Sequence, residues 1–392
     1  MDSTLGWLLF PLGTALGWYL ARRGPKARPQ APPTPEAGML AGISTQAFDD
    51  PDQAVAALLA DEHLTEEAVE LHLTLGSLFR RRGQVDRALR VHEALLTRPS
   101  LSPAQRNRTE YELAEDYLKA GVLDRAEKLF TGLADRGFKL LACLESIIAI
   151  YENLHEWERA IEASRRLEAA SGQSRRTITA QYYCEQAEDA RRAKDPAKAS
   201  MLAAKAQSHD KGCARASLVQ ARLAEDAKDL DAAASAYALA AEREPRLLAD
   251  IVRPLWICCR DGGKPENFVH WLEDLPEEER VGATDAVRAE LLRESGMDPS
   301  GYLLDAMERR PNWAVLEQIA QLDAPADSPL IARTSAALKS AVTTLVRAHP
   351  RYQCNSCGMK PAQLFWQCPS CKQWGTVLPA EDRLEVRTSP LP

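Results

Sequence analysis

Four cysteines close to the C-terminus form the clearest pattern in the sequence that could do chemistry. Cys354 and Cys357 make one C-x-x-C pair, and Cys368 and Cys371 make a second, with ten residues between the pairs. Each pair can form a tight turn that places two thiolates on one side of a cation, and two such turns close a tetrahedral shell. The spacing therefore predicts that these four cysteines bind one metal ion, zinc or iron.

Three interpretations of this cysteine cluster compete. A structural metal site is favoured, because four thiolates leave no position open for water or substrate. A redox centre is the second, since the same shell also holds iron. Nucleic-acid binding is the third, but residues 346–380 carry four basic residues and no acid, an excess too small to define a binding track. The whole chain has a net charge of −7, which argues against binding to phosphate backbones.

The residues around the four cysteines predict a small domain that depends on its metal. Gly358 follows the first pair directly, where a turning backbone benefits from the lack of a Cβ. Phe365, Trp366 and Trp374 are expected to form a small apolar cap. Because so short a domain has little core of its own, metal binding can supply roughly 10–16 kcal/mol of apparent folding free energy.

An internal repeat between residues 50 and 340 predicts the fold of the rest of the chain. Alanines at the equivalent position of successive helix pairs recur 34 to 39 residues apart, at residues 88, 126, 160, 199 and 233. A period near 34 is typical of the tetratricopeptide repeat, and stacking buries the apolar face that one copy cannot bury alone. An unrelated all-helical bundle is the alternative. The sequence predicts an all-α tetratricopeptide-repeat solenoid with a small metal-binding domain at its end.

A solenoid of this type is expected to bind partners through the face made by the first helix of each pair. Similarity to tetratricopeptide proteins places nine polar or aromatic residues on that face: Arg80, Arg81, Tyr111, Lys119, Glu152, Asn153, Arg191, Arg192 and Arg222. Their mixed charge suits recognition of a protein or peptide. For any one of these residues, a merely solvated side chain is the simpler explanation, so the prediction concerns the surface as a whole.

The first twenty-one residues are predicted to be a transmembrane signal anchor. The stretch from Ser3 to Ala21 has no charge, which is close to the ~20 residues that span a bilayer. Basic residues follow it at 22, 23, 26 and 28, so the bulk of the chain is expected in the cytoplasm and the short N-terminus in the periplasm. A cleaved signal peptide fits less well, because a basic start and an A-x-A site are missing. A buried soluble helix is the other alternative.

Two smaller features adjoin this anchor. Gly13 and Gly17 form a GxxxG pair, a spacing that lets membrane helices approach closely and leaves homo-oligomerisation open. Five prolines between residues 24 and 36 favour an extended spacer behind the anchor.

The rest of the sequence gives no sign of catalysis. Its seven histidines show no metal spacing such as H-E-x-x-H, and neither a G-x-S-x-G motif nor a GxxxxGK[ST] phosphate loop occurs. The five cysteines outside the C-terminal cluster are scattered through helical sequence, which suits a reducing compartment. The sequence predicts a protein that is not an enzyme.

This order of parts resembles the lipopolysaccharide assembly protein B family of Gram-negative bacteria. The most specific pieces are residues 76–96 and LFWQCPSCKQWGT at 364–376, the second of which looks like the family's rubredoxin-type ending. The predicted parts are an anchor at 1–21, a Pro-rich linker at 22–42, the repeat array at 43–345, a rubredoxin-like zinc ribbon at 346–380 and a tail at 381–392.

The resemblance implies a function in the control of lipopolysaccharide synthesis. Members of the family are inner-membrane adaptors that bring the deacetylase committing precursors to lipid A to a membrane-bound AAA+ zinc protease, which degrades it. By that resemblance, other inner-membrane lipopolysaccharide-assembly proteins are further partners, and the metal domain packs against the array and is needed for activity. A passive scaffold for lipopolysaccharide-assembly enzymes and a redox sensor are the alternatives.

Overall fold

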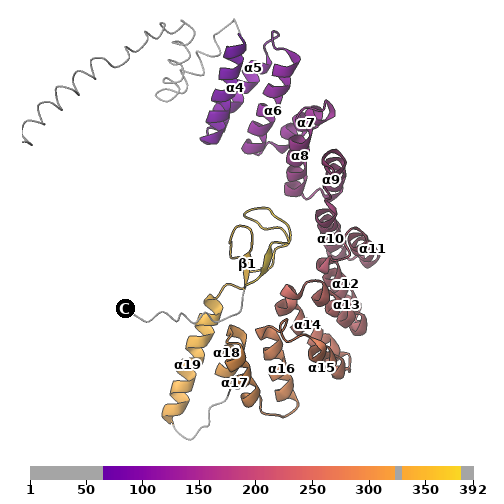
Figure 1. Cartoon of the computed structure of the whole chain (residues 1–392), viewed down its shortest axis with the longest axis vertical. Coiled ribbons are helices and arrows are strands. Elements are labelled where there is room, and N and C mark those ends of the chain that lie inside the picture. Colours follow the sequence, from indigo (N-terminus) through magenta and orange to yellow (C-terminus); the bar gives the residue numbers. More distant parts are fainter. Residues whose placement is uncertain (1–64, 323–328, 381–392) are drawn as a thin grey trace, which may run out of the picture. The chain divides into compact units, whose positions relative to one another are not determined.

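The computed structural model describes residues 65–322 and 329–380, without the side chains of 329–333, and it is mostly helical (Figure 1). The chain divides into two compact units, residues 1–143 and 144–392. The predicted anchor at 1–21 with Gly13 and Gly17, the linker at 22–42 and the tail at 381–392 lie outside the described residues. Within the residues that the structure describes, no helix is both long and apolar enough to cross a bilayer.

The described part of the first unit consists of antiparallel helix pairs. Its helices are α4 (Glu66–Arg81), α5 (Val85–Leu96), α6 (Pro103–Ala120) and α7 (Leu123–Asp135). Thr65 caps α4 by accepting a hydrogen bond from the Ala68 N–H (3.2 Å), and Ser102 forms a capping box with Gln105 at the start of α6. Gly121 ends α6 in the left-handed conformation that glycine adopts readily. The starts of α4 and α6 and the end of α6 thus follow from local sequence signals.

Small residues lie where these helices cross, as the repeat pattern predicts. Ala88 and Ala126 are fully buried. Phe79 packs beside Ala88 and Val91 in one apolar cluster. The second helix α5 also contacts α6, the first helix of the next pair. The tetratricopeptide-type helix pair is therefore confirmed in this unit.

A buried polar contact joins three helices of the first unit. The Nδ1 atom of His92 in α5 lies 2.5 Å from a carboxylate oxygen of Asp116 in α6, and both side chains are fully buried. Arg80 in α4 donates to the other oxygen of Asp116 at 2.6 Å. Gly76 in α4 leaves the space for the imidazole, because a Cβ at this position would lie 2.3 Å from Nε2 of His92.

Replacing Gly76 with alanine is expected to destabilise the first unit by about 1–3 kcal/mol, because the added methyl group overlaps the buried ring. Gly132 is a matched control, since it also lies within a helix but its Cβ would meet nothing closer than 3.5 Å. There alanine is expected to stabilise by up to about 1 kcal/mol through helix propensity. Urea unfolding of the two variants tests this prediction, and equal effects at both glycines would contradict it.

The second unit also consists of helix pairs. Its first helix, α8 (Leu140–Leu154), begins just before the boundary between the units. The helices that follow are α9 (Trp157–Ser171), α10 (Arg176–Arg192), α11 (Pro196–His209), α12 (Ala214–Asp226), α13 (Leu230–Arg243), η1 (Pro245–Leu247), α14 (Leu248–Asp261), α15 (Pro265–Asp274), α16 (Gly282–Glu294), α17 (Ser300–Arg309), α18 (Trp313–Ala320) and α19 (Pro329–Ala348).

Packing inside the second unit repeats that of the first. The predicted alanines at the helix crossings, Ala160, Ala199 and Ala233, are fully buried. A large apolar cluster spans α12 to α16 and includes Trp256 and Phe268, whose rings are 5.2 Å apart between centroids. The fold is a tetratricopeptide-like stack of helix pairs, and an exact 34-residue period is not needed to build it.

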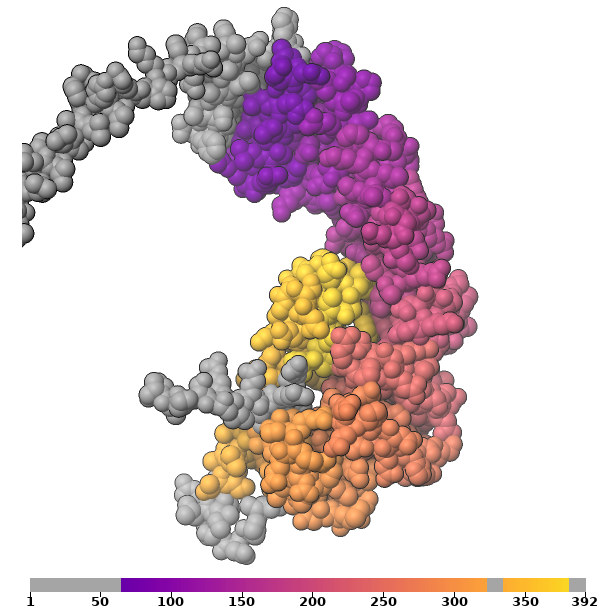
Figure 2. All heavy atoms as spheres, in the orientation of Figure 1, coloured from indigo at the N-terminus to yellow at the C-terminus, as the bar shows by residue number. Residues whose placement is uncertain are grey.

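A small ribbon, residues 352–379, follows the last helix. Strands β1 (Tyr352–Cys354) and β2 (Val377–Pro379) pair antiparallel, with Tyr352 opposite Pro379 and Cys354 opposite Val377. Figure 2 shows the yellow atoms of this ribbon against the helices of the second unit. The ribbon lies within the predicted domain at 346–380, and it brings the two cysteine pairs together.

Candidate functional site: a tetracysteine metal centre

The four cysteine sulfurs converge on one point. The ligand atoms of Cys354, Cys357, Cys368 and Cys371 all lie within 4.8 Å of one another. The Sγ atoms of Cys354 and Cys371 are 3.7 Å apart, as are those of Cys357 and Cys368. Ligands at ~2.3 Å from a zinc ion in a regular tetrahedron would be about 3.8 Å apart. The donor set therefore fits one tetrahedral thiolate-bound metal ion, with no position left for water.

Two equivalent turns present the sulfurs. In the first, the Gly358 N–H donates to the carbonyl of Cys354 at 2.8 Å, and in the second the Lys372 N–H donates to the carbonyl of Cys368 at 2.9 Å. Both donors have positive φ, +74° at Gly358 and +59° at Lys372. The sequence predicted the role of Gly358, but the lysine in the equivalent place gave no such signal.

Exchanging these two residue types is expected to move stability in opposite directions. Gly358→Ala should destabilise the ribbon by about 1–2 kcal/mol, because only the backbone is strained and a Cβ meets no atom within 4 Å. Lys372→Gly should instead stabilise the ribbon by removing the same strain. The measurement is the chelator concentration that releases half of the metal from each variant. A loss of metal retention in Lys372→Gly would contradict the strain argument.

Hydrogen bonding favours the thiolate at two of the four positions. The Thr376 hydroxyl, 3.3 Å from the sulfur, lowers the pKa of Cys354 to about 6. The backbone N–H of Gln373 lowers the pKa of Cys371. Burial instead raises the pKa of Cys368 to about 11. A cation at the centre stabilises every bound thiolate, so it would offset the effect of burial at Cys368.

The ribbon is fastened to the helices of the second unit by one carboxylate. Glu152 in α8 accepts hydrogen bonds from the Trp374 indole N–H (2.8 Å) and the Gln367 side-chain amide (2.9 Å), both in the ribbon. It also accepts one from the Tyr182 hydroxyl of α10 at 2.6 Å. Burial raises the pKa of Tyr182 and so keeps this hydroxyl a donor. Glu152 thus joins two helices to the metal-binding domain.

Aromatic rings surround this carboxylate. The Trp374 ring contacts those of Trp157 and Tyr182, with centroids 6.1 Å and 5.6 Å away, in edge-to-face geometry. Trp157 and Tyr182 in turn stack on each other at 6.0 Å. The hydrogen bonds to Glu152 are therefore enclosed by apolar surface, which strengthens them relative to exposed ones.

A second group of contacts joins other residues of the ribbon to the helices. The Tyr352 hydroxyl donates to Asp250 in α14 at 2.7 Å, and burial raises the pKa of Tyr352 to about 12. The guanidinium of Arg215 in α12 lies 5.2 Å from the centre of the Trp366 ring. The tryptophans expected to cap the metal site, Trp366 and Trp374, thus pack on the helices, while Phe365 does pack against the ribbon's own core.

All nine residues predicted for partner binding lie on first helices of their pairs, in α4, α6, α8, α10 and α12. Three of the arginines are engaged by acids of neighbouring helices: Arg80 by Glu112 and Asp116, Arg191 by Asp226, and Arg222 by Glu188. The others lie as follows: Arg81, Lys119 and Asn153 are exposed, Arg192 is paired with Asp189, Tyr111 packs on Phe130 and Phe138, and Glu152 holds the ribbon. Their contact with a partner stays a prediction.

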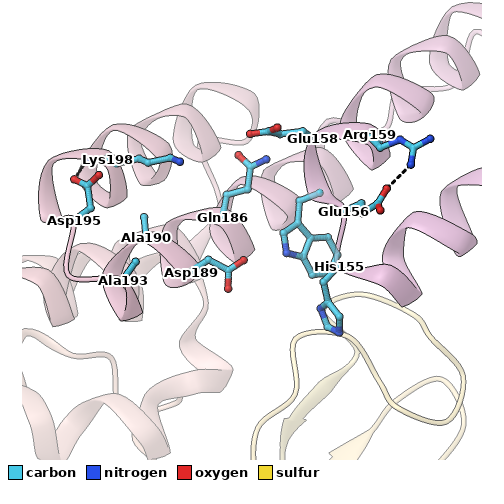
Figure 3. Close-up of a pocket in the computed structure, with 11 residues that line it drawn as sticks. His155, Glu156, Glu158, Arg159, Gln186, Asp189, Ala190, Ala193, Asp195 and Lys198 are labelled. Carbon is cyan, nitrogen blue, oxygen red and sulfur yellow. Dashed lines mark hydrogen bonds and ion pairs between the residues drawn. The ribbon is translucent and has the colours of Figure 1, made fainter.

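A shallow pocket of about 470 Å³ lies between the α8–α9 and α10–α11 turns, lined by residues that include Glu156, Arg159, Asp195 and Lys198 (Figure 3). Its polar groups serve the helices themselves. Glu156 is paired with Arg159, and Asp195 accepts a hydrogen bond from the Lys198 N–H that caps α11. The arrangement contains no nucleophile with an adjacent base, so it does not resemble a catalytic site.

Comparison with known proteins agrees with this architecture. A family model for a rubredoxin metal binding domain matches residues 352–379, which is the ribbon. Among solved structures, a tetratricopeptide repeat protein from Parabacteroides merdae is 14% identical with a TM-score of 0.31, and the match covers 70% of this chain and 98% of that one. At that score the match adds nothing to the fold assignment, which rests on the helix pairs themselves.

Two curated relatives match nearly end to end. Lipopolysaccharide assembly protein B of Escherichia coli K12 is 30% identical over 382 residues, covering 95% of this chain and 97% of the relative. The protein of the same name from Haemophilus influenzae is 28% identical over 388 residues, covering 96% and 98%. With the helix pairs and the four-cysteine ribbon included in these matches, the chain belongs to the lipopolysaccharide assembly protein B family.

Proposed function

We propose that this chain is a non-enzymatic adaptor of the bacterial inner membrane that presents the deacetylase committing precursors to lipid A to a membrane-bound AAA+ protease for degradation. The observation that carries the proposal is the near end-to-end match to relatives named for lipopolysaccharide assembly. Helical repeats and ribbon are matched together, so the whole architecture is shared. Other inner-membrane lipopolysaccharide-assembly proteins are further partners in this proposal.

The helical repeats suit binding better than chemistry. Stacked helix pairs offer an extended surface of mixed charge, which is the usual basis of protein recognition by such repeats. Arg81, Lys119 and Asn153 are exposed on first helices and available to a partner. In this proposal they contribute to client binding, together with the rest of the predicted surface.

The metal has a structural task in this proposal. Cys354, Cys357, Cys368 and Cys371 would hold it, and when bound it supplies the cross-link that this small ribbon needs to stay folded. The ribbon in turn connects α8, α10, α12 and α14 through Glu152, Trp366 and Tyr352. Binding of the metal therefore stabilises the part of the array where the ribbon docks.

Residues 1–21 would anchor the chain in the inner membrane, with the short N-terminus in the periplasm and the repeats in the cytoplasm. Confinement beside a membrane-bound protease raises the effective concentration of the adaptor without tight contacts. Removing residues 1–21 should leave a chain that folds but regulates poorly.

The deacetylase half-life tests this function. Deleting the gene should lengthen the half-life several-fold, because the client no longer reaches the protease, and the full chain should restore it. Unchanged turnover would favour the alternative of a passive scaffold for lipopolysaccharide-assembly enzymes. A redox sensor predicts instead a visible ferric-thiolate absorption that disappears on reduction, and purified protein that holds only zinc would count against it.

A further inference from the structure

The last helix of the array, α19, has an exposed apolar face. Leu338 and Leu345 are 61% and 55% exposed, the highest values among the large exposed apolar residues of the described chain. Ala341 and Ala348 are exposed as well. The spacing of these four residues, three then four then three, places them along one side of the helix. It is the spacing through which one helix packs against another.

This face belongs to the last helix of the array. In the middle of the array the second helix of a pair packs on the first helix of the next pair, as α11 does on α12 and α13 on α14. The main contact of α19 is with α18, beside which it lies in Figure 1, and its buried Val342 and the ring contact of His349 with Trp313 belong to its packed side. Helical arrays usually end in a polar capping face, and the face of Leu338 and Leu345 is not polar.

The segment that comprises α19 and the ribbon carries charge of one sign, unlike the acid-rich helices α16 to α18 before it. The chain has 56 acidic residues, yet residues 328–380 contain none. Lys339, Arg347, Lys360 and Lys372 are exposed and form no ion pair within the part of the chain that the structure describes. Many arginines of the earlier helices are paired with acids of neighbouring helices, as Arg253 is with Glu290. Within the described residues, α19 and the ribbon therefore carry positive charge that no acid pairs with at these four positions.

The apolar spacing and the positive charge favour one kind of partner for this face over the alternatives. A second copy of α19 would bring another acid-free basic helix, so like charges would oppose pairing. An anionic bilayer fits poorly, because two leucines form a narrow apolar strip without the aromatic residues that interfacial helices use. An acidic amphipathic helix fits both the apolar spacing and the charge. The basic residues of α19 lie on other sides of the helix than the leucines. They would therefore attract an acidic partner helix through the local electrostatic potential rather than by direct ion pairs.

We propose that the Leu338–Ala348 face of α19 is a docking surface for an acidic amphipathic helix of a partner protein. The partner helix adds to the end of the array as the next first helix would, with its own apolar residues against Leu338, Ala341, Leu345 and Ala348. The partner's identity rests on the proposed function, in which the client deacetylase and the protease are the two candidate partners. The surface is separate from the first-helix residues predicted earlier.

A photo-crosslinker tests this surface in the full chain. Benzoylphenylalanine placed at position 341 should crosslink, in membranes that contain the deacetylase and the protease, to an acidic helix of one of them, identified by peptide sequencing. Leu338→Glu combined with Leu345→Glu should reduce the yield about tenfold or more, because two apolar contacts are lost. Met201→Glu is the matched control, since Met201 is an exposed apolar residue of α11 (49%) and should leave the yield unchanged.

Charge provides a second readout. Lys339→Glu combined with Arg347→Glu should lower the crosslinking yield at low salt and weaken its dependence on salt, whereas Lys198→Glu on α11 should do neither. Crosslinks to lipid, to a second copy or to a segment that is not acidic would each overturn the proposal, as would a yield that the leucine variants do not change. The deacetylase half-life separates the two ideas. If gene deletion lengthens it but the leucine variants do not, the adaptor function stands and this docking surface falls.

Discussion

Replacing Cys354 or Cys368 with serine is expected to release the metal and unfold the ribbon. Both sulfurs are almost fully buried, and each is one of only four ligands. A serine hydroxyl does not replace a thiolate, so the metal's folding free energy, of the order of 10 kcal/mol, is lost to a ribbon whose own core is small. The measurements are metal content by mass spectrometry and the proteolytic susceptibility of the segment after α19. Deacetylase turnover should slow as much as in the gene deletion.

Ser370→Ala is the matched control for these variants. Ser370 lies inside the second cysteine turn and is exposed, but it is not among the four ligands. Its variant should retain one metal ion per chain and normal turnover. A Cys354→Ser chain that keeps full adaptor activity after losing its metal would contradict the structural role of the site.

The metal ligands could be predicted from the sequence because their geometry is local. Two residues separate the cysteines of each pair, so the backbone turn alone brings two sulfurs together. The buried alanines of the helix crossings were also predictable, since packing between helices of one pair involves residues close in sequence. Both predictions depend only on residues that are close together in the sequence, and the structure confirms both.

The docking of the ribbon depends on contacts that no local pattern marks. Glu152 meets Gln367 and Trp374 across 215 and 222 residues of sequence. Trp366 and Trp374 lie next to the cysteines, and so were expected to cover the metal. Phe365 instead packs against the ribbon's core of Tyr352, Cys354, Cys368 and Val377, while the two tryptophans pack on the helices. Their closeness to the cysteines in the sequence therefore did not predict that these two tryptophans contact the helices.

Glu152 is the helix residue of this docking contact, and its partner in the ribbon could not be predicted from the sequence either. Its place on a first helix predicted an exposed partner contact, and the structure does put it on that helix. A polar side chain on this face can serve a partner or another part of the same chain, and the sequence does not distinguish the two. The nearby Trp157 and Tyr182 were the available hint, because a buried Tyr hydroxyl needs a hydrogen-bond partner.

Replacing Glu152 with glutamine is expected to loosen the ribbon by about 2–4 kcal/mol while leaving the helix pairs folded. The carboxylate accepts three hydrogen bonds, from Tyr182, Gln367 and Trp374. Glutamine has the same shape, but its amide is neutral and has one acceptor oxygen. The hydrogen bonds that Tyr182 and Trp374 donate to Oε1 are therefore weakened, and the Gln367 amide, which donates to Oε2, meets a second N–H donor. Hydrogen exchange of the ribbon and its rate of metal release to a chelator are the measurements.

Two further variants separate this carboxylate from general effects of lost charge. Glu188→Gln removes an acid of α10 that pairs with Arg191 and Arg222 but does not contact the ribbon, so ribbon exchange should not change. Trp374→Phe removes the indole N–H and part of the ring surface that packs on Trp157 and Tyr182 but keeps an aromatic ring, so it should cost about 1–3 kcal/mol. Combined with Glu152→Gln, it should add less than its single effect, because both act on one hydrogen bond. Full additivity would mean that the rings, rather than Glu152, hold the ribbon on the array.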